Sequence, residues 1–179
     1  MLKKIPFKKI LRYTFFLTIS FLMGMGIGSY AIIYYESVAT KPWSWKDSPV
    51  VVNCMGEDID NQRIYDAVNF WILQGEKLGP IIYKGSEELC ENRQAKYFIL
   101  LKAAAPGQLD LNVYAITSTR RRLNNIVSAT IYFDADTQNL PFLAEHELGH
   151  ALGYSHVKVD GHVMYPYYEG MGGRFWFPN

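Results

Sequence analysis

The stretch that decides the fold of this chain is His146-Glu147-Leu148-Gly149-His150-Ala151-Leu152-Gly153-Tyr154-Ser155-His156. Residues four apart on an α-helix lie on the same face, so a helix here would direct the imidazoles of His146 and His150 at one ion. Gly153 has no Cβ, which allows the positive φ that ends a helix and turns the chain back sharply. His156 can then reach the same ion as a third ligand.

The number of ligands indicates what kind of metal site this is. Structural zinc sites are closed by four protein ligands, whereas catalytic zinc sites keep one position for water or substrate. We therefore predict one catalytic Zn2+ bound by His146, His150 and His156. Glu147 follows the first ligand and would lie beside the ion, where a carboxylate can act as the general base toward an activated water. His162, the remaining histidine, is expected to be a solvated loop side chain.

The stretch resembles the long zinc signature of the metzincin metallopeptidases, which continues to a turn that contains methionine. Met164 lies eight residues after His156, and its surroundings, Val163-Met164-Tyr165-Pro166-Tyr167-Tyr168, are similar to the Met-turn of the matrixin branch. In matrixins this methionine lies beneath the zinc ligands, and a following Pro-x-Tyr lines a substrate pocket. The resemblance implies a Met-turn at Met164 and a pocket shaped by Pro166 and Tyr168.

A second resemblance lies upstream, where Ile131-Tyr132-Phe133-Asp134-Ala135-Asp136 is similar to the strand that matrixins place along the substrate cleft. We expect Ile131–Phe133 to be an edge strand that pairs with the backbone of an extended substrate. Acidic residues of this region help to bind a structural Ca2+ in matrixins. Thr137 stands where the family has a glutamate, so Asp134 and Asp136 are expected to be solvated turn carboxylates.

The N-terminal part of the chain predicts a membrane anchor. Residues 13–35 carry no charge, and these twenty-three residues would form a helix about 34 Å long, against about 30 Å for the hydrocarbon core of a bilayer. Residues 1–12 contain five basic and no acidic residues, so the positive-inside rule keeps them in the cytoplasm. We expect a single-pass membrane protein with an extracytoplasmic catalytic domain. Alternatively, Ser29-Tyr30-Ala31 is a signal-peptidase site and the domain is secreted.

Cys54 and Cys90 both follow this segment, in the part expected to meet an oxidising compartment, so a disulfide is their predicted state. Two buried free thiols, or one thiol that masks the zinc, are the alternatives.

The charge balance excludes nucleic acid as a partner. Subtracting the five basic residues of 1–12 from the total of 18 leaves thirteen Lys and Arg against 17 Asp and Glu, a net of about −4. The basic cluster of residues 36–179 is Arg120-Arg121-Arg122, which is expected to lie on a hairpin turn. The oligomeric state stays open.

The remaining pattern predicts one α+β domain. Residues 36–49 contain two prolines and two tryptophans and are predicted to be a stalk, and residues 50–179 suffice for one core. The resemblance implies a metzincin-like twisted mixed β-sheet with a backing helix and an active-site helix. The expected strands are 50–55, 97–101, 111–116 and 126–133, and the backing helix is 61–77, with apolar positions Ile64, Ala67, Val68, Trp71 and Ile72.

These features together predict a zinc-dependent endopeptidase that hydrolyses peptide bonds of extracytoplasmic proteins, with a polypeptide as substrate. One alternative is a membrane-tethered peptide-binding module of the same fold without catalysis, although such a scaffold has no need of Glu147. The other is a zinc hydrolase that acts on cell-wall amide bonds, since the same metal chemistry serves many carbonyl groups.

Overall fold

The domain is built on a mixed β-sheet, in a computed structural model that describes residues 40–92 and 95–175. The described strands are β1 (Ser44–Trp45), β2 (Val50–Asn53), β3 (Ile81–Ile82), β4 (Phe98–Ala103), β5 (Ala115–Arg122) and β6 (Asn125–Phe133). They follow the order β1-β6-β4-β2-β3, and every pair in that series is parallel. β5 pairs antiparallel with β6. The expected mixed sheet is therefore present.

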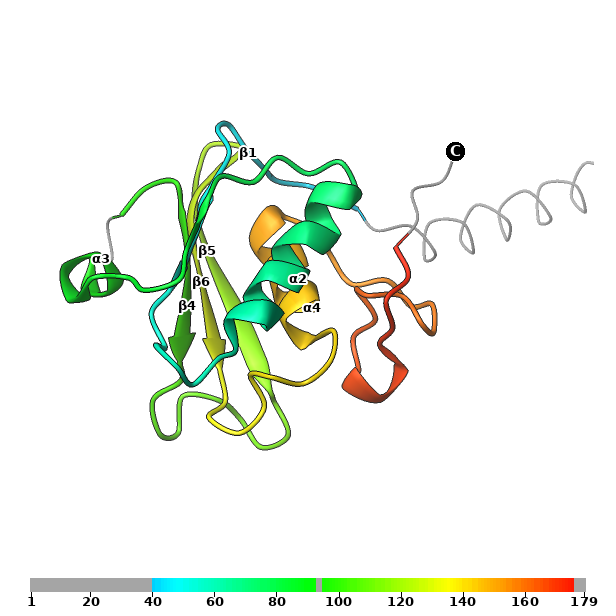
Figure 1. Cartoon of the computed structure of the whole chain (residues 1–179). Helices are drawn as coiled ribbons and strands as arrows, with labels where there is room; N and C mark the ends of the chain where they lie inside the picture. Colours follow the sequence, from blue (N-terminus) through cyan, green and yellow to red (C-terminus); the bar gives the residue numbers. More distant parts are fainter. Residues whose placement is uncertain (1–39, 93–94, 176–179) are drawn as a thin grey trace, which may run out of the picture. The chain divides into compact units, whose positions relative to one another are not determined.

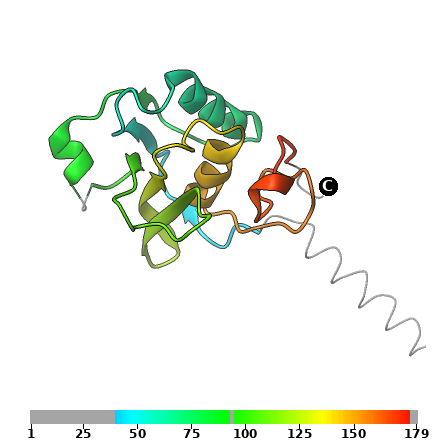
Figure 2. The ribbon, with the colours of Figure 1, turned by 90° about the horizontal axis from the view of Figure 1, so that it is seen from below.

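Two helices, α2 (Asn61–Leu73) and α4 (Leu143–Leu152), pack together on one face of the sheet (Figure 1). The short α3 (Glu87–Glu91) lies apart from them, beyond the other side of the sheet. A single 3₁₀ turn, η1 (Tyr168–Gly170), belongs to the C-terminal segment, which lies beside α4 when the domain is seen from below (Figure 2).

α2 is the expected backing helix, although it is shorter than predicted. The side chain of Asp60 caps its N-terminus by accepting a hydrogen bond from the Gln62 N–H. The helix ends at Leu73 instead of residue 77, because the chain turns at Gly75 with a φ of 92°. Four of the five predicted apolar positions are buried. Ile72 is 47% exposed, so the prediction that it belongs to the apolar face was wrong.

Polar contacts tie α2 to α4. Trp71 Nε1 donates a hydrogen bond to the carbonyl oxygen of Glu145, at 2.7 Å. Arg63 forms an ion pair of 2.7 Å with the Glu145 carboxylate, which is almost fully buried. Burial raises the pKa of Glu145 and the charge of Arg63 opposes that rise. A buried carboxylate needs such a partner, so the pair fixes the helices against each other.

β5, and not β6, is the edge strand beside the cleft, so the prediction that Ile131–Phe133 is an edge strand was wrong. β6 is bordered by β4 on one side and by β5 on the other along this stretch. Among the described residues β5 pairs only with β6, which leaves its second edge available to another extended chain.

The hairpin also differs in detail from its prediction. The strand expected at 111–116 begins only at Ala115, because Asn112 has a left-handed backbone with φ of 68°. It then continues through all three arginines. The turn itself is made by Leu123 and Asn124, so the arginines belong to the strand and not to the turn.

Residues 40–49 were predicted to be stalk, but they are part of the domain. β1 pairs with the start of β6. The Ser155 N–H donates a hydrogen bond of 2.9 Å to the Thr40 carbonyl oxygen, and Trp45 Nε1 donates one of 2.8 Å to that of Ala151. Backbone and indole contacts thus bind this segment to the end of α4.

The predicted membrane anchor at 13–35 lies outside the described residues. Within the described part of the chain, no helix has the length and apolar character needed to cross a bilayer.

The predicted disulfide is present. Cys54, directly after β2, is bonded to Cys90 in α3, with 5.7 Å between their Cα atoms. The bond attaches the α3 region to the end of β2, and neither cysteine lies in the cleft described below.

Candidate metal centre and substrate cleft

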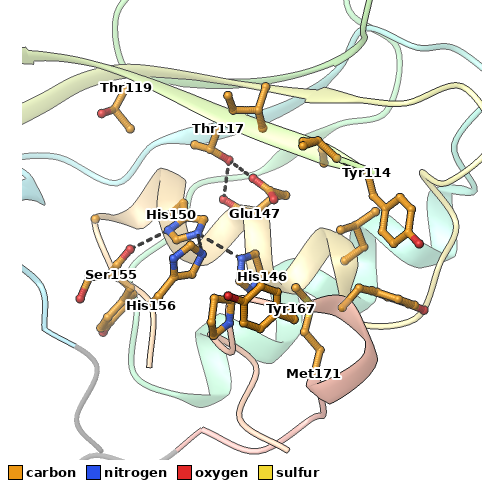
Figure 3. A pocket seen from close by; sticks show the side chains of 18 of the residues that line it. Tyr114, Thr117, Thr119, His146, Glu147, His150, Ser155, His156, Tyr167 and Met171 are labelled. Carbon is orange, nitrogen blue, oxygen red and sulfur yellow. Dashed lines mark hydrogen bonds between the residues drawn. The ribbon is translucent and has the colours of Figure 1, made fainter. Parts of the chain in front are cut away.

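Three histidine side chains converge at the surface of α4 (Figure 3). His146 and His150 lie one helical turn apart, and their Nε2 atoms are 3.1 Å apart. His156 comes from the loop after the helix and brings its Nε2 to 3.0 Å from that of His150. In the described part of the chain these three residues form the one cluster with metal-ligand geometry. The sequence had predicted this set.

The hydrogen bonds of the rings show that the cluster suits a zinc ion. His146 Nδ1 lies 2.7 Å from the Val163 carbonyl oxygen, and His150 Nδ1 lies 2.8 Å from that of Tyr154. A carbonyl oxygen only accepts, so each Nδ1 carries the proton and each Nε2 presents a lone pair to the centre. A cation satisfies such converging lone pairs. Tetrahedral zinc at its usual bond length sets ligand nitrogens about 3.3 Å apart, close to the observed spacing.

The electrostatic surroundings keep the imidazoles neutral, which is the form that binds metal. Burial and, to a lesser extent, the nearby His150 together lower the pKa of His146 to about 3. Burial likewise lowers the pKa of His150 to about 4, against the opposing hydrogen bond to Tyr154. The pKa of His156 is also lowered by burial. All three are therefore available as ligands at neutral pH.

Gly153 makes the turn that brings His156 back, as predicted from its missing Cβ. It is the C-cap of α4 with φ of 106°, and its N–H donates to the His150 carbonyl oxygen. A Cβ at this position would also collide with the carbonyl oxygen of Trp43. This second constraint comes from the 40–49 segment, which local sequence does not place beside the turn.

Glu147 lies next to the histidines and is only 5% exposed. Its carboxylate Oε2 accepts a hydrogen bond of 2.5 Å from the Thr117 hydroxyl, which also lies 3.0 Å from the Glu147 carbonyl oxygen. Burial raises the pKa of Glu147 to about 7, and the hydrogen bond from Thr117 opposes the rise. A carboxyl with a pKa near neutrality can both take and give a proton. Sequence reasoning missed Thr117, thirty residues away on β5.

A cleft of about 740 Å³ runs between β5 and the loops that follow α4. Pro166 and Tyr168, the predicted pocket residues, both line it, and the Tyr168 ring packs edge-on against Tyr114 at 5.4 Å. Tyr167 and Met171, which the sequence analysis did not select, line the same end (Figure 3). Three tyrosines, Tyr114, Tyr167 and Tyr168, therefore line the cleft together with Glu147.

A family model described as matrixin, peptidase family M10, matches residues 49–175. The chain belongs to the matrixin family. Members of this family use a catalytic zinc ion, and the three converging histidines of this chain fit such an ion.

Individual relatives of this matrixin match over limited lengths. Matrilysin of Rattus norvegicus is 56% identical over 32 residues, which cover 18% of this chain and 12% of matrilysin. The crystal structure of metalloproteinase-II from Bacteroides fragilis aligns with a TM-score of 0.41 and 18% identity, covering 75% of this chain and 50% of that one. The chain therefore spans half or less of the length of either protein.

The Met-turn of this matrixin supports the first zinc histidine. Met164 is fully buried beneath α4, and a Cβ on Gly149 would collide with its sulfur. The residue before it, Val163, supplies the carbonyl oxygen that accepts from His146. A methionine can pack directly under the metal cluster because the helix carries a glycine between the two helical ligands.

His162 was predicted to be solvated, and that prediction was wrong. The side chain is fully buried, and its Nδ1 accepts a hydrogen bond of 2.9 Å from the Met164 N–H. Burial lowers the pKa of His162 to about 4, so the ring is neutral and can accept. Its role in the described structure is to hold the backbone of the Met-turn.

Asp134 and Asp136 are exposed after β6, in agreement with solvated turn carboxylates. Thr137, which replaces the family's glutamate, donates instead to the Tyr114 carbonyl oxygen at 2.9 Å. Whether calcium binds here stays a prediction.

Proposed function

We propose that this matrixin is an active endopeptidase that hydrolyses peptide bonds of extracytoplasmic proteins. Its support is the arrangement of Glu147, whose buried carboxylate faces the same open cleft as the three converging imidazoles. A pure binding module has no use for a carboxylate at that point. The cleft is also bordered by the free edge of β5, so an extended peptide can pair with the strand while its side chains enter the cleft.

In the proposed mechanism His146, His150 and His156 would hold the zinc ion, which would supply Lewis acidity to the scissile carbonyl and to the attacking water. Glu147 accepts the proton of that water and later donates it to the leaving amine. Thr117 keeps the carboxylate in place by its hydrogen bond to Oε2, which leaves Oε1 for the proton. The hydrogen bonds from the Nδ1 atoms to backbone carbonyls keep the ligand rings oriented throughout.

We also propose that the domain works outside the cytoplasm, attached by residues 13–35. The uncharged run and the basic residues before it support this orientation. The Cys54–Cys90 disulfide supports an oxidising compartment. Cleavage after the same segment would instead give a secreted enzyme. Labelling of an engineered exposed cysteine in intact cells distinguishes a domain outside the membrane from one inside.

The activity is tested with the full chain, zinc-loaded in detergent, on a mixed peptide library read by mass spectrometry. Glu147→Gln and a chelator should each abolish cleavage. Glu169→Gln, which alters another carboxylate of the cleft, serves as the matched control and should retain it. Tight peptide binding without cleavage by the wild type favours the binding module, and cleavage of cell-wall fragments alone favours the amide hydrolase.

A further inference from the structure

The three consecutive arginines of β5 have different surroundings. Arg120 donates hydrogen bonds to the Ser128 hydroxyl at 3.0 Å and to the Ala95 carbonyl oxygen at 3.1 Å, away from the active-site cleft. Arg121 lines the cleft, and its guanidinium carbon lies 4.5 Å from the centroid of the Trp43 ring. Arg121 and Arg122 are both exposed, but Arg122 does not line the cleft.

Arg121 reaches the cleft through the alternation of a β-strand. Thr117, Thr119 and Arg121 are alternate residues of β5, and all three line the cleft. Figure 3 shows Thr119 displaced from Thr117 toward the His156 and Ser155 end, away from Tyr114 and Met171. The strand thus leads from the Glu147 contact to a basic side chain at one end of the cleft.

Trp43 gives this arginine a fixed position. It belongs to the segment that hydrogen-bonds to the Ser155 loop through Thr40, and it lines the cleft together with Pro42. A guanidinium that stacks on an indole keeps its N–H edge free for a planar acceptor. The side chain is therefore oriented before any ligand arrives.

Among the described residues, Arg121 forms no ion pair with a carboxylate. In residues 40–92 and 95–175, the ion pairs are Lys41–Glu76, Arg63–Asp66 and Arg63–Glu145. At the opposite end of the cleft, beside Tyr167 and Tyr168, the charged lining residue is Glu169. The cleft is therefore basic at one end and acidic at the other.

We propose that Arg121, held by Trp43, forms a subsite for an acidic side chain of the polypeptide substrate. The proposal rests on the proposed endopeptidase activity and adds a specificity to it. A carboxylate is the planar acceptor that matches the guanidinium fork. Arg121 lies four residues beyond Thr117, or about 13 Å along the strand, so the acidic residue stands about three or four residues from the scissile bond.

The test uses the full-length, zinc-loaded protein and a neutral peptide that it cleaves. A glutamate is moved through four positions on each side of the scissile bond, with glutamine at the same position as reference. Glutamate should raise kcat/KM about three- to fivefold at one position, on one side only, as expected for a partly exposed ion pair. Arg121→Gln should remove this preference, and Arg121→Glu should reverse it in favour of lysine. Arg122→Gln, its neighbour outside the cleft, should leave it unchanged.

Equal cleavage of the glutamate and glutamine peptides by the wild type at every position would overturn the subsite. So would a preference that survives in Arg121→Gln. Either result leaves cleavage of the neutral peptide, and hence the proposed function, intact. If the wild type cleaves nothing, the same comparison is made by fluorescence anisotropy with the peptides bound to wild type and Arg121→Gln, and equal Kd values for glutamate and glutamine reject the subsite.

Discussion

The Thr117 hydroxyl donates a 2.5 Å hydrogen bond to Glu147 Oε2, which connects the edge strand of the sheet to the carboxylate beside the three histidines. The strand along which we expect the substrate to lie is therefore also the strand that orients the general base. A substrate that shifts β5 would shift Glu147 with it.

Thr117→Val should lower kcat about tenfold, with a smaller change in KM. The methyl group has nearly the same volume as the hydroxyl, but it leaves a buried carboxylate oxygen without its donor, at a cost of about 1–3 kcal/mol. Thr117→Ser, which restores the hydroxyl, should recover most of the rate. Thr119→Val is the matched control, because Thr119 lies on the same side of β5 and lines the cleft. Steady-state kinetics with one peptide measures all three, and equal losses in both valine variants would contradict a positioning role.

The zinc histidines and the glycine turn could be predicted because their chemistry is local. The spacing of His146 and His150 on a helix, and the positive φ that Gly153 can adopt, depend only on residues near in sequence. The Thr117 contact could not be predicted, since it needs the order of strands in the sheet. The same strand order makes β5, and not β6, the edge strand beside the cleft.

Two other errors have the same physical origin. His162 is a single histidine in a loop, without any periodic pattern that would signal burial, yet the Met-turn encloses it completely. Residues 40–49 are rich in polar and charged groups, as in a linker, but Trp45 binds the end of α4 through its indole N–H. The helical or strand periodicity of a sequence does not reveal tertiary contacts of this kind.

Removal of zinc should destabilise the domain. Without the ion, three Nε2 lone pairs face one another at about the spacing of metal ligands. Zinc at a thousandfold excess over its Kd adds about 4 kcal/mol to the free energy of unfolding. Calorimetry of the chelated protein should therefore give a lower Tm, which Zn2+ restores and Mg2+, which prefers oxygen ligands, does not. His156→Ala should lose the zinc-dependent shift, and an unchanged shift in that variant would exclude His156 as a ligand.

The disulfide should contribute stability without affecting the metal centre. Cys54 and Cys90 are separated by 36 residues, and loop-entropy arithmetic gives about 3 to 4 kcal/mol for a closed loop of this length. The double Cys54→Ser, Cys90→Ser variant should lose about that much free energy of unfolding in urea. Its zinc content per folded molecule, measured by atomic absorption, should remain one. A fall in zinc content at denaturant-free conditions would mean that the bond supports the site itself.

Gly153→Ala should destabilise the protein by more than the conformational strain of its backbone alone would. Gly75 provides the matched control, since it also has a positive φ, of 92°, but has nothing within 4 Å of the position of an added Cβ. Gly75→Ala should therefore cost only the left-handed strain, about 1–2 kcal/mol in urea unfolding. At Gly153, with φ of 106°, the same methyl group also meets the carbonyl oxygen of Trp43. The 40–49 segment or the turn must then move, and His156 moves with the turn, so zinc affinity should fall in Gly153→Ala and stay unchanged in Gly75→Ala. Equal zinc Kd values for the two variants would show that the collision is absorbed by the Trp43 segment alone.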